Sequence, residues 1–296
     1  MNRRTFVKNS SLTAFSVAAL GSIHWNGKSF VADSVTTTDI LGPFYRPGAP
    51  MRSDLIPKGS SGELMHVEGT IFQKDGKTPL SGALVEVWQC DEHEHYDNTS
   101  DDYLFRGAAK TDAKGKYYFR TIVPVPYKAS PTQWRPAHIH FRISSANHQD
   151  LITQIYFKGD NYLDGDPGSA SPQAKDRILP IGKNAAQEKT VKFDVVMGAA
   201  FPLEASAYKK ICGLYKMENG NAEFYNEDDL LFLKQNGQLV EAMAYKGNNT
   251  FEGGIGYVKA VFEFTKAGET KVKIHRGRFD DTDQVAVHEG VKFLKY

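Results

Sequence analysis

The most informative stretch of this chain is Trp134-Arg135-Pro136-Ala137-His138-Ile139-His140-Phe141. Two histidines stand two residues apart, and successive side chains of a β-strand point to opposite faces of the sheet. We therefore expect the His138 and His140 imidazoles to project from one face, while Ile139 points into the layer on the other side. Two neutral imidazoles from one strand supply half of a metal site, and Arg135 adds a permanent cation at its edge.

Short alternating segments separated by turns surround this stretch. The clearest are residues 67–72, 84–88, 117–122 and 151–157, and residues 190–197 are expected to form a closing strand. Many short strands rich in β-branched and aromatic residues, with Gly, Asp and Asn in the turns, indicate an all-β sandwich. No long stretch shows the 3.6-residue period of a helix.

The pattern changes in residues 201–296. Hairpin signals recur at regular spacing, at Asn219-Gly220, Asn236-Gly237, Gly253-Gly254 and Ala267-Gly268. They predict an antiparallel meander that closes on itself as a small β-barrel. The segment is similar to the lipocalin-like module appended to some exported hydrolases. It carries no cluster of candidate metal ligands, so we expect an accessory, packing or binding role.

Composition excludes several classes of function. The 296 residues contain 36 Lys and Arg against 35 Asp and Glu, a net charge of +1. This balance gives no electrostatic reason to expect a nucleic acid or an anionic membrane as partner. The two cysteines, Cys90 and Cys212, define neither a disulfide framework nor a zinc site.

The first 32 residues are expected to be an export signal and linker. Arg3-Arg4-Thr5-Phe6-Val7-Lys8 precedes a weakly apolar run over residues 12–21, and no acidic residue occurs before Asp33. The apolar run is too short to span a bilayer. Adjacent arginines in this setting resemble a twin-arginine signal, which predicts a periplasmic protein.

Two tyrosines accompany the histidine strand. Tyr127 follows Pro126, which holds the segment extended at a loop, and Tyr96 lies in the loop after the 84–88 strand. Phenolates are hard anionic donors, and they suit a hard trivalent metal better than zinc or copper(I). Two tyrosinates and two neutral histidines would leave one net positive charge on iron(III), which one hydroxide would neutralise.

Further motifs stand around these residues in order along residues 41–159. With the two tyrosines and the 134–141 stretch, they resemble the motifs of the intradiol ring-cleavage dioxygenases, non-haem iron(III) enzymes typified by protocatechuate and catechol dioxygenases. The resemblance implies a catalytic β-sandwich over residues 33–200. The motifs are Leu41-Gly42-Pro43-Phe44-Tyr45, Gly82-Ala83-Leu84-Val85-Glu86-Val87-Trp88-Gln89, Thr111-Asp112, Gly115-Lys116-Tyr117-Tyr118-Phe119-Arg120-Thr121-Ile122, Pro126-Tyr127 and Thr153-Gln154-Ile155-Tyr156-Phe157.

The same resemblance implies roles for particular residues. Iron(III) would be held by Tyr96, Tyr127, His138 and His140, with Tyr127 and His140 axial. A catechol-type diol would displace Tyr127 and be cleaved with O2 to a cis,cis-muconate-type diacid. Arg135 would stabilise the negative charge that builds on the ring, and Gln154 would line the oxygen side of the pocket. A homo-oligomer is the habit of the family.

The chain also departs from the family pattern. Only the export signal and a short linker precede the sandwich, where catechol-specific members carry a helical dimerisation segment. The core therefore looks more like the protocatechuate type. That type often has a tryptophan two residues after the axial tyrosine, and this chain has Ala129 there. The C-terminal module is not part of the common family plan.

Other interpretations remain open from the residues alone. The segment Glu92-His93-Glu94-His95 imitates a metal cluster, but we interpret it as a solvated rim. We interpret Asp160, Asp164 and Asp166 as solvated turn residues, because their spacing fits no EF-hand loop. The sandwich also resembles prealbumin-like domains, so an exported non-catalytic binding protein is the main alternative. A small-molecule-binding barrel is a third possibility.

Overall fold

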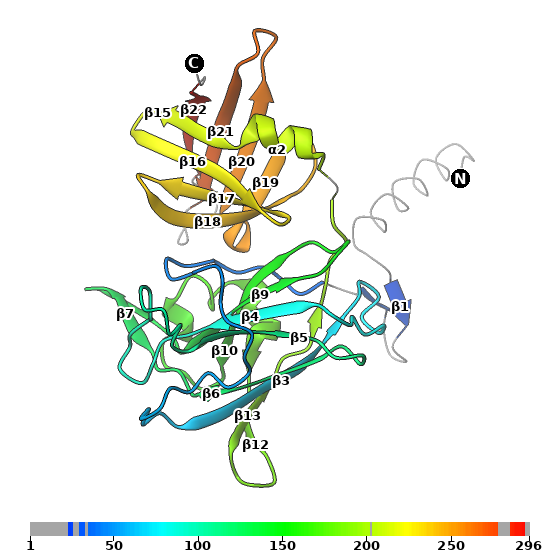
Figure 1. The fold of residues 1–296 in the computed structure, drawn as a ribbon, viewed down its shortest axis with the longest axis vertical. Coiled ribbons are helices and arrows are strands. Elements are labelled where there is room, and N and C mark those ends of the chain that lie inside the picture. Colours follow the sequence, from blue (N-terminus) through cyan, green and yellow to red (C-terminus); the bar gives the residue numbers. More distant parts are fainter. Residues whose placement is uncertain (1–22, 26–29, 33–34, 202, 278–284, 294–296) are drawn as a thin grey trace, which may run out of the picture.

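The computed structural model describes residues 23–25, 30–32, 35–201, 203–277 and 285–293. In the segment expected to be a signal and linker, this covers only the antiparallel hairpin of β1 (Ile23–Trp25) and β2 (Phe30–Ala32). The paired arginines and the apolar run lie outside the described residues. The rest of the chain forms a β-sandwich and a β-barrel that sits on it (Figure 1). Within the described ranges, no helix has the length and apolar character needed to cross a bilayer.

The first sheet of the sandwich contains the histidine strand. Its order is β11-β10-β9-β4-β5. Along β9 the predicted alternation is confirmed, because Ile139 lies in the apolar core while His138 and His140 lie on the outer face. The strands are β4 (Leu84–Trp88), β5 (Arg106–Lys110), β9 (His138–Ser144), β10 (Leu151–Phe157) and β11 (Ile178–Leu179).

The second sheet is built on β3, and it corrects one prediction. Residues 190–197 do not form one closing strand but two short ones, each parallel to β3. Between them the Phe193 carbonyl accepts a hydrogen bond from the Tyr117 hydroxyl, at 2.7 Å, and the Asp194 carboxylate accepts one from the Thr70 amide, at 2.9 Å. The strands are β3 (Leu64–Phe72), β6 (Lys116–Ile122), β12 (Gly182–Lys183), β13 (Lys189–Lys192) and β14 (Val195–Val196).

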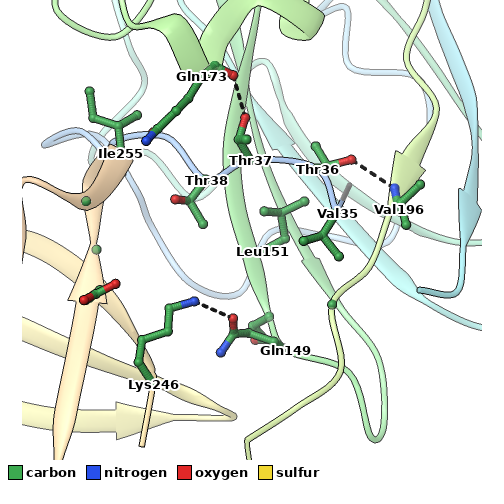
Figure 2. Close-up of a pocket in the computed structure, with 15 residues that line it drawn as sticks. Val35, Thr36, Thr37, Thr38, Gln149, Leu151, Gln173, Val196, Lys246 and Ile255 are labelled. Carbon is green, nitrogen blue, oxygen red and sulfur yellow. Dashed lines mark hydrogen bonds between the residues drawn. The ribbon is translucent and has the colours of Figure 1, made fainter. Parts of the chain in front are cut away.

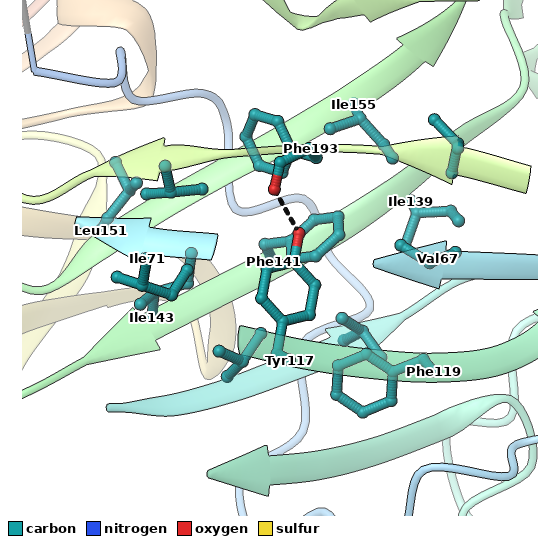
Figure 3. Packing of buried hydrophobic residues seen from close by; sticks show 14 of the residues in the cluster. Val67, Ile71, Tyr117, Phe119, Ile139, Phe141, Ile143, Leu151, Ile155 and Phe193 are labelled. Carbon is teal, nitrogen blue, oxygen red and sulfur yellow. Dashed lines mark hydrogen bonds between the residues drawn. The ribbon is translucent and has the colours of Figure 1, made fainter. Parts of the chain in front are cut away.

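The two sheets enclose one apolar core (Figure 3). Phe141 of β9 lies at its centre, against Tyr117 and Phe193 of the opposite layer, with ring centroids 6.2 and 5.2 Å away. Burial of such aromatic side chains is the main stabilising contribution in a sandwich of this size. This core fixes β9 from one side, and so fixes the direction in which its histidines project.

Two short connections complete the sandwich. The hairpin of β7 (Tyr127–Ser130) and β8 (Gln133–Arg135) leads into β9. After β10, the 3-10 helices η1 (Leu163–Gly165) and η2 (Pro172–Arg177) carry the chain to β11.

The C-terminal strands close into an eight-stranded antiparallel barrel, as predicted. Apolar side chains fill its interior, among them Phe224, Phe251 and Phe262. The helix α2 (Ala205–Ile211) precedes the barrel and η3 (Gly254–Gly256) interrupts it. The strands are β15 (Gly213–Met217), β16 (Gly220–Glu227), β17 (Leu230–Gln235), β18 (Gln238–Tyr245), β19 (Thr250–Gly253), β20 (Val258–Phe264), β21 (Thr270–Gly277) and β22 (Val285–Lys292).

The barrel covers the outer face of the first sheet. Residues 36–45, which we call the strap, run between the two bodies as the blue segment in Figure 1. Strap residues Leu41 and Tyr45 share one buried apolar cluster with Trp88 of the sheet and with Phe232 of the barrel. The face of the sheet that carries the histidines is therefore buried beneath the strap and the barrel.

Candidate metal centre

All four predicted ligands meet on the covered face of the first sheet. Tyr96 comes from the loop after β4, Tyr127 begins β7, and His138 and His140 lie on β9. The Tyr96 hydroxyl lies 3.2 Å from His138 Nε2, which lies 3.2 Å from His140 Nε2. The Tyr127 ring centroid is 5.6 Å from those of Tyr96 and His138. All four side chains are buried.

Both histidines are held as neutral imidazoles, the form that binds a metal. Burial, reinforced by the nearby Arg135 charge, lowers the pKa of His138 to about 3. Burial also lowers the pKa of His140 well below its usual value, and His138 and Arg135 act in the same direction. Because His138 Nδ1 donates to the Pro136 carbonyl at 2.7 Å, its Nε2 keeps a free lone pair directed at the cluster.

The pKa values of the two tyrosines are shifted in the opposite direction, upwards. Burial raises the pKa of Tyr96 well above its usual value, with Tyr127 adding to the rise, and burial also raises the pKa of Tyr127. In the protein alone both phenols therefore keep their protons. A bound cation favours the phenolate, as it does for any coordinated acid.

The geometry and the donor types fit a hard trivalent ion. Bonds from protein ligands to a small metal ion are about 2.0–2.2 Å long, so two donors at a right angle lie about 3 Å apart. The 3.2 Å separations around His138 Nε2 are of this size. Among the described residues, no three His, Cys, Asp or Glu side chains gather to hold a metal. Two phenols and two imidazoles match iron(III) better than zinc or copper(I).

Arg135 lies beside the cluster and is paired with an unexpected partner. Its Nη1 lies 3.4 Å from His138 Nε2, and its Nε donates to the Asp166 carboxylate at 2.7 Å. The prediction that Asp166 is a solvated turn residue is wrong, since this side chain is buried and also accepts from the Gly168 and Ser169 amides. Burial opposes its ionisation, but Arg135 holds the Asp166 pKa below its usual value.

Gln154, the remaining predicted site residue, contacts Arg135 and the strap. It is opposite His140 on β10, and its Oε1 accepts from Arg135 Nη2 at 3.0 Å and lies 3.1 Å from the Tyr156 hydroxyl oxygen. Its amide group donates to the Ile40 carbonyl of the strap. Gln154 therefore ties Arg135 to the strap.

A buried pair that sequence reasoning missed lies behind this link. Arg177 of η2 forms an ion pair with Asp39 of the strap and donates to the Gln154 carbonyl at 2.8 Å. The Tyr156 hydroxyl donates to the same Asp39 carboxylate at 3.0 Å. No local pattern marks this pair, because its members stand 138 positions apart.

The strap also contacts two ligands directly. Phe44 stacks on Tyr96, with ring centroids 4.2 Å apart and planes 15° apart. Gly42 has φ +74°, and a Cβ added there would lie 3.1 Å from His140 Cε1. The motif over residues 41–45 was noted from the sequence without a role, and the structure places it over the site.

The rim residues lie where the sequence predicted. His93, Glu94 and His95 are exposed on the loop before Tyr96. The Glu92 carboxylate accepts from the Ser60 hydroxyl at 3.0 Å and from the Ser61 amide at 2.7 Å. This segment therefore belongs to the surface of the loop rather than to a metal site.

A separate cavity of about 280 Å³ lies between the sandwich and the barrel (Figure 2). None of the four ligands lines it. The Lys246 ammonium crosses it to the Gln149 side chain at 2.8 Å, and Thr36 and Thr37 hydrogen-bond along its opposite wall (Figure 2). The candidate metal centre and this cavity are therefore distinct places in the fold.

Known proteins match the same part of the chain. Residues 40–199, more than half of the chain, match a family model described as a dioxygenase. The chain belongs to the intradiol ring-cleavage dioxygenase family. It is 37% identical over 171 residues to a chlorocatechol 1,2-dioxygenase of Rhodococcus opacus, over 50% of this chain and 65% of that protein. To a catechol 1,2-dioxygenase of Acinetobacter lwoffii it is 36% identical over 173 residues, 52% of this chain and 62% of that protein.

Solved structures of the family have the same fold over this region. A catechol 1,2-dioxygenase from Pseudomonas arvilla C-1 gives a TM-score of 0.51 at 29% identity, over 67% of this chain and 69% of that one. One from Acinetobacter sp. ADP1 gives 0.52 at 25% identity, over 64% and 68%. The resemblance found in the motifs is thereby confirmed. The matched part of this chain spans less than two thirds of the length of the Rhodococcus opacus and Acinetobacter lwoffii enzymes.

Proposed function

We propose that this chain is an iron(III)-dependent intradiol dioxygenase that cleaves a catechol-type aromatic diol with O2 to a cis,cis-muconate-type diacid. The observation that carries the proposal is the convergence of the Tyr96 hydroxyl and the two imidazole Nε2 atoms, with Tyr127 adjacent. The names of the relatives, catechol and chlorocatechol 1,2-dioxygenases, support the substrate class. When bound, iron(III) would supply a Lewis acid that draws electron density from the ring of a diol.

The residues around the centre have distinct tasks in this proposal. Tyr96, Tyr127, His138 and His140 would hold the ion, and all four side chains are buried. A Tyr127 phenolate formed beside the cation would be a strong base, because burial raises the pKa of this phenol, and it would take a proton from a diol hydroxyl. The Arg135 guanidinium, fixed by Asp166 and Gln154, faces the negative charge that builds on the substrate.

The visible absorption spectrum tests the proposal. Iron-loaded protein is expected to show a broad tyrosinate-to-iron(III) band that shifts when catechol is added without oxygen. His138→Ala is expected to lose the iron. Arg135→Ala is expected to keep the iron and the band but to turn over roughly 100-fold more slowly, the usual cost of one electrostatic donor.

The alternative makes different predictions for the same measurements. A protein that stays colourless after iron loading would favour the non-catalytic binding sandwich. Turnover that survives the double substitution Tyr96→Phe and His138→Ala would also contradict the dioxygenase proposal.

We also propose that the protein is exported to the periplasm by a twin-arginine signal. The support is the Arg3-Arg4 pair, followed by a short apolar run. Replacing both arginines by lysine is expected to keep the protein out of the periplasmic fraction. Unchanged export of that variant would contradict the proposal and favour an ordinary secretory signal.

A further inference from the structure

The two histidines of the centre are oriented by different means. His138 donates its second ring nitrogen to the Pro136 carbonyl at 2.7 Å. His140 Nδ1 is buried and has no hydrogen-bond partner among the described residues. Histidine ligands almost always have such a partner, since it fixes the direction of the ring. Something other than a hydrogen bond must therefore orient His140.

Packing against neighbouring side chains orients His140 instead. The His140 ring stacks on Trp88, with centroids 4.8 Å apart and planes 8° apart. Its other neighbours include Gly42 of the strap. Trp88 is buried, and its Nε1 has no hydrogen-bond partner among the described residues, so packing positions this ring as well. The orientation of His140 then depends on whatever supports Trp88.

That support extends into the barrel. Tyr45 of the strap packs against Trp88, with centroids 5.1 Å apart, and stacks on Phe232 of β17, with centroids 5.9 Å and planes 19° apart. Arg142 Nη1 donates hydrogen bonds to the Tyr45 hydroxyl oxygen, at 2.6 Å, and to the carboxylate of Glu227 in the barrel, at 2.8 Å. Phe232 is fully buried and is the first barrel ring in a continuous row of rings that starts at His140 and runs through Trp88 and Tyr45.

We propose that Phe232 is a positioning residue for the metal ligand His140, so that the C-terminal barrel completes the candidate iron site. This inference rests on the proposed iron-dependent function. Removing the flat face of Phe232 lets Tyr45 and Trp88 shift, and among the described residues His140 Nδ1 has no hydrogen-bond partner that would hold the ring in place. Of the two histidines, His138 has a hydrogen bond on its second ring nitrogen and His140 has none among the described residues, which makes the site sensitive to the barrel.

The experiment compares two substitutions of the same kind in the same barrel. Phe232→Leu breaks the row of rings. Phe224→Leu is the matched control, because Phe224 is equally buried but packs on Tyr215 and Phe262 inside the barrel. Both remove similar apolar contacts, so both are expected to lower the Tm. Iron affinity is measured against a competing chelator, and the tyrosinate-to-iron(III) band is recorded with and without catechol in the absence of oxygen.

Phe232→Leu is expected to weaken iron binding about tenfold and to shift the band, as changes behind a metal ligand do. Phe224→Leu is expected to keep wild-type iron affinity and the wild-type band. Equal iron affinity and equal bands in the two variants would overturn the inference and leave the iron site itself intact. Wild-type protein that binds no iron would overturn the proposed function, and this inference with it. If Phe232→Leu does not fold, Phe232→Met fills the space without a flat ring and gives the same comparison.

Discussion

Single side chains at the centre depend on partners from distant parts of the chain. Arg135 and Asp166 are both buried, and two of their hydrogen bonds run in parallel, at 2.7 and 3.3 Å. A buried ion pair of this kind adds little net stability, but loss of one partner leaves an uncompensated charge. The direction of the Arg135 guanidinium is therefore set by a carboxylate in the loop after β10.

The substitution Asp166→Asn is expected to reduce both stability and turnover. The neutral amide leaves the Arg135 charge unpaired, which costs about 3 kcal/mol of unfolding free energy, and it frees the guanidinium to turn away from the substrate. Denaturant unfolding and kcat measure the two effects, and iron content should stay unchanged. Asp164→Asn is the control, because Asp164 is exposed on the same loop. Equal behaviour of the two variants would contradict a positioning role for Asp166.

The four candidate ligands could be named from the sequence, and the residues that support them could not. The spacing of His138 and His140 and the neighbouring motifs mark the ligands, since these features are local. The partners Asp166, Asp39 and Arg177 become neighbours only when separate loops fold onto one sheet. An Asp in a polar, Gly-rich loop has the same local pattern whether it is solvated or buried.

Among the elements, the strap has the course that is hardest to predict. The strands β4, β9 and β10 follow from the period-two alternation, and the structure confirms their positions. Residues 36–45 form no β-strand, so their sequence has no alternating pattern from which their course could be predicted. Hydrogen bonds to single atoms hold the strap instead, as between the Asp39 amide and the Ile152 carbonyl, 2.9 Å apart.

Close approach of the strap to His140 predicts an effect of Gly42→Ala. An alanine in the left-handed backbone conformation, with positive φ, lowers the unfolding free energy by on the order of 1 kcal/mol. The added Cβ would lie only 3.1 Å from His140 Cε1. Iron affinity is expected to fall as the imidazole is displaced. Gly59→Ala is the control, because Gly59 has φ +90° and no atom within 4 Å of an added Cβ. It shares the backbone cost without the contact.

Chelator competition and thermal unfolding separate the two contributions of Gly42→Ala. Both variants should lose similar stability, and only Gly42→Ala should lose iron. If the two variants retain iron equally, the strap covers the site without shaping it.

The two bodies of the molecule meet through a buried apolar cluster and through ion pairs of the buried Arg142 side chain. Sequence patterns predicted a sandwich and a barrel, but not the face on which they meet, because an interface has no period. Arg142 illustrates the difficulty. It lies on β9 two residues after a predicted ligand, yet its partners include Glu86 and Asp150 of the sandwich and Glu227 of the barrel.

Glu241 of β18 makes the stability of this arrangement depend on pH. Its carboxyl group is buried near the strap and accepts from the Ala242 amide at 3.1 Å. Burial raises its pKa to about 8, against lowering contributions from Ala242, Arg276 and Leu41. An unfolded Glu titrates near ~4.3. Between these values the folded protein keeps a proton that the unfolded chain releases, so stability is full below the lower pKa and falls as pH rises towards 8.

The substitution Glu241→Gln is expected to remove this part of the pH dependence. Glutamine keeps the acceptor oxygen and carries no charge at any pH, so the Tm of the variant should exceed that of the wild type slightly at pH 5 and by much more at pH 8. The slope that disappears is at most about 1.4 kcal/mol per pH unit. Glu263→Gln, at an exposed position of β20, is the control. Thermal unfolding from pH 5 to pH 9 measures all three proteins. Parallel curves for the wild type and Glu241→Gln would mean that Glu241 is already ionised in the folded protein, and that the join between strap and barrel tolerates a buried charge.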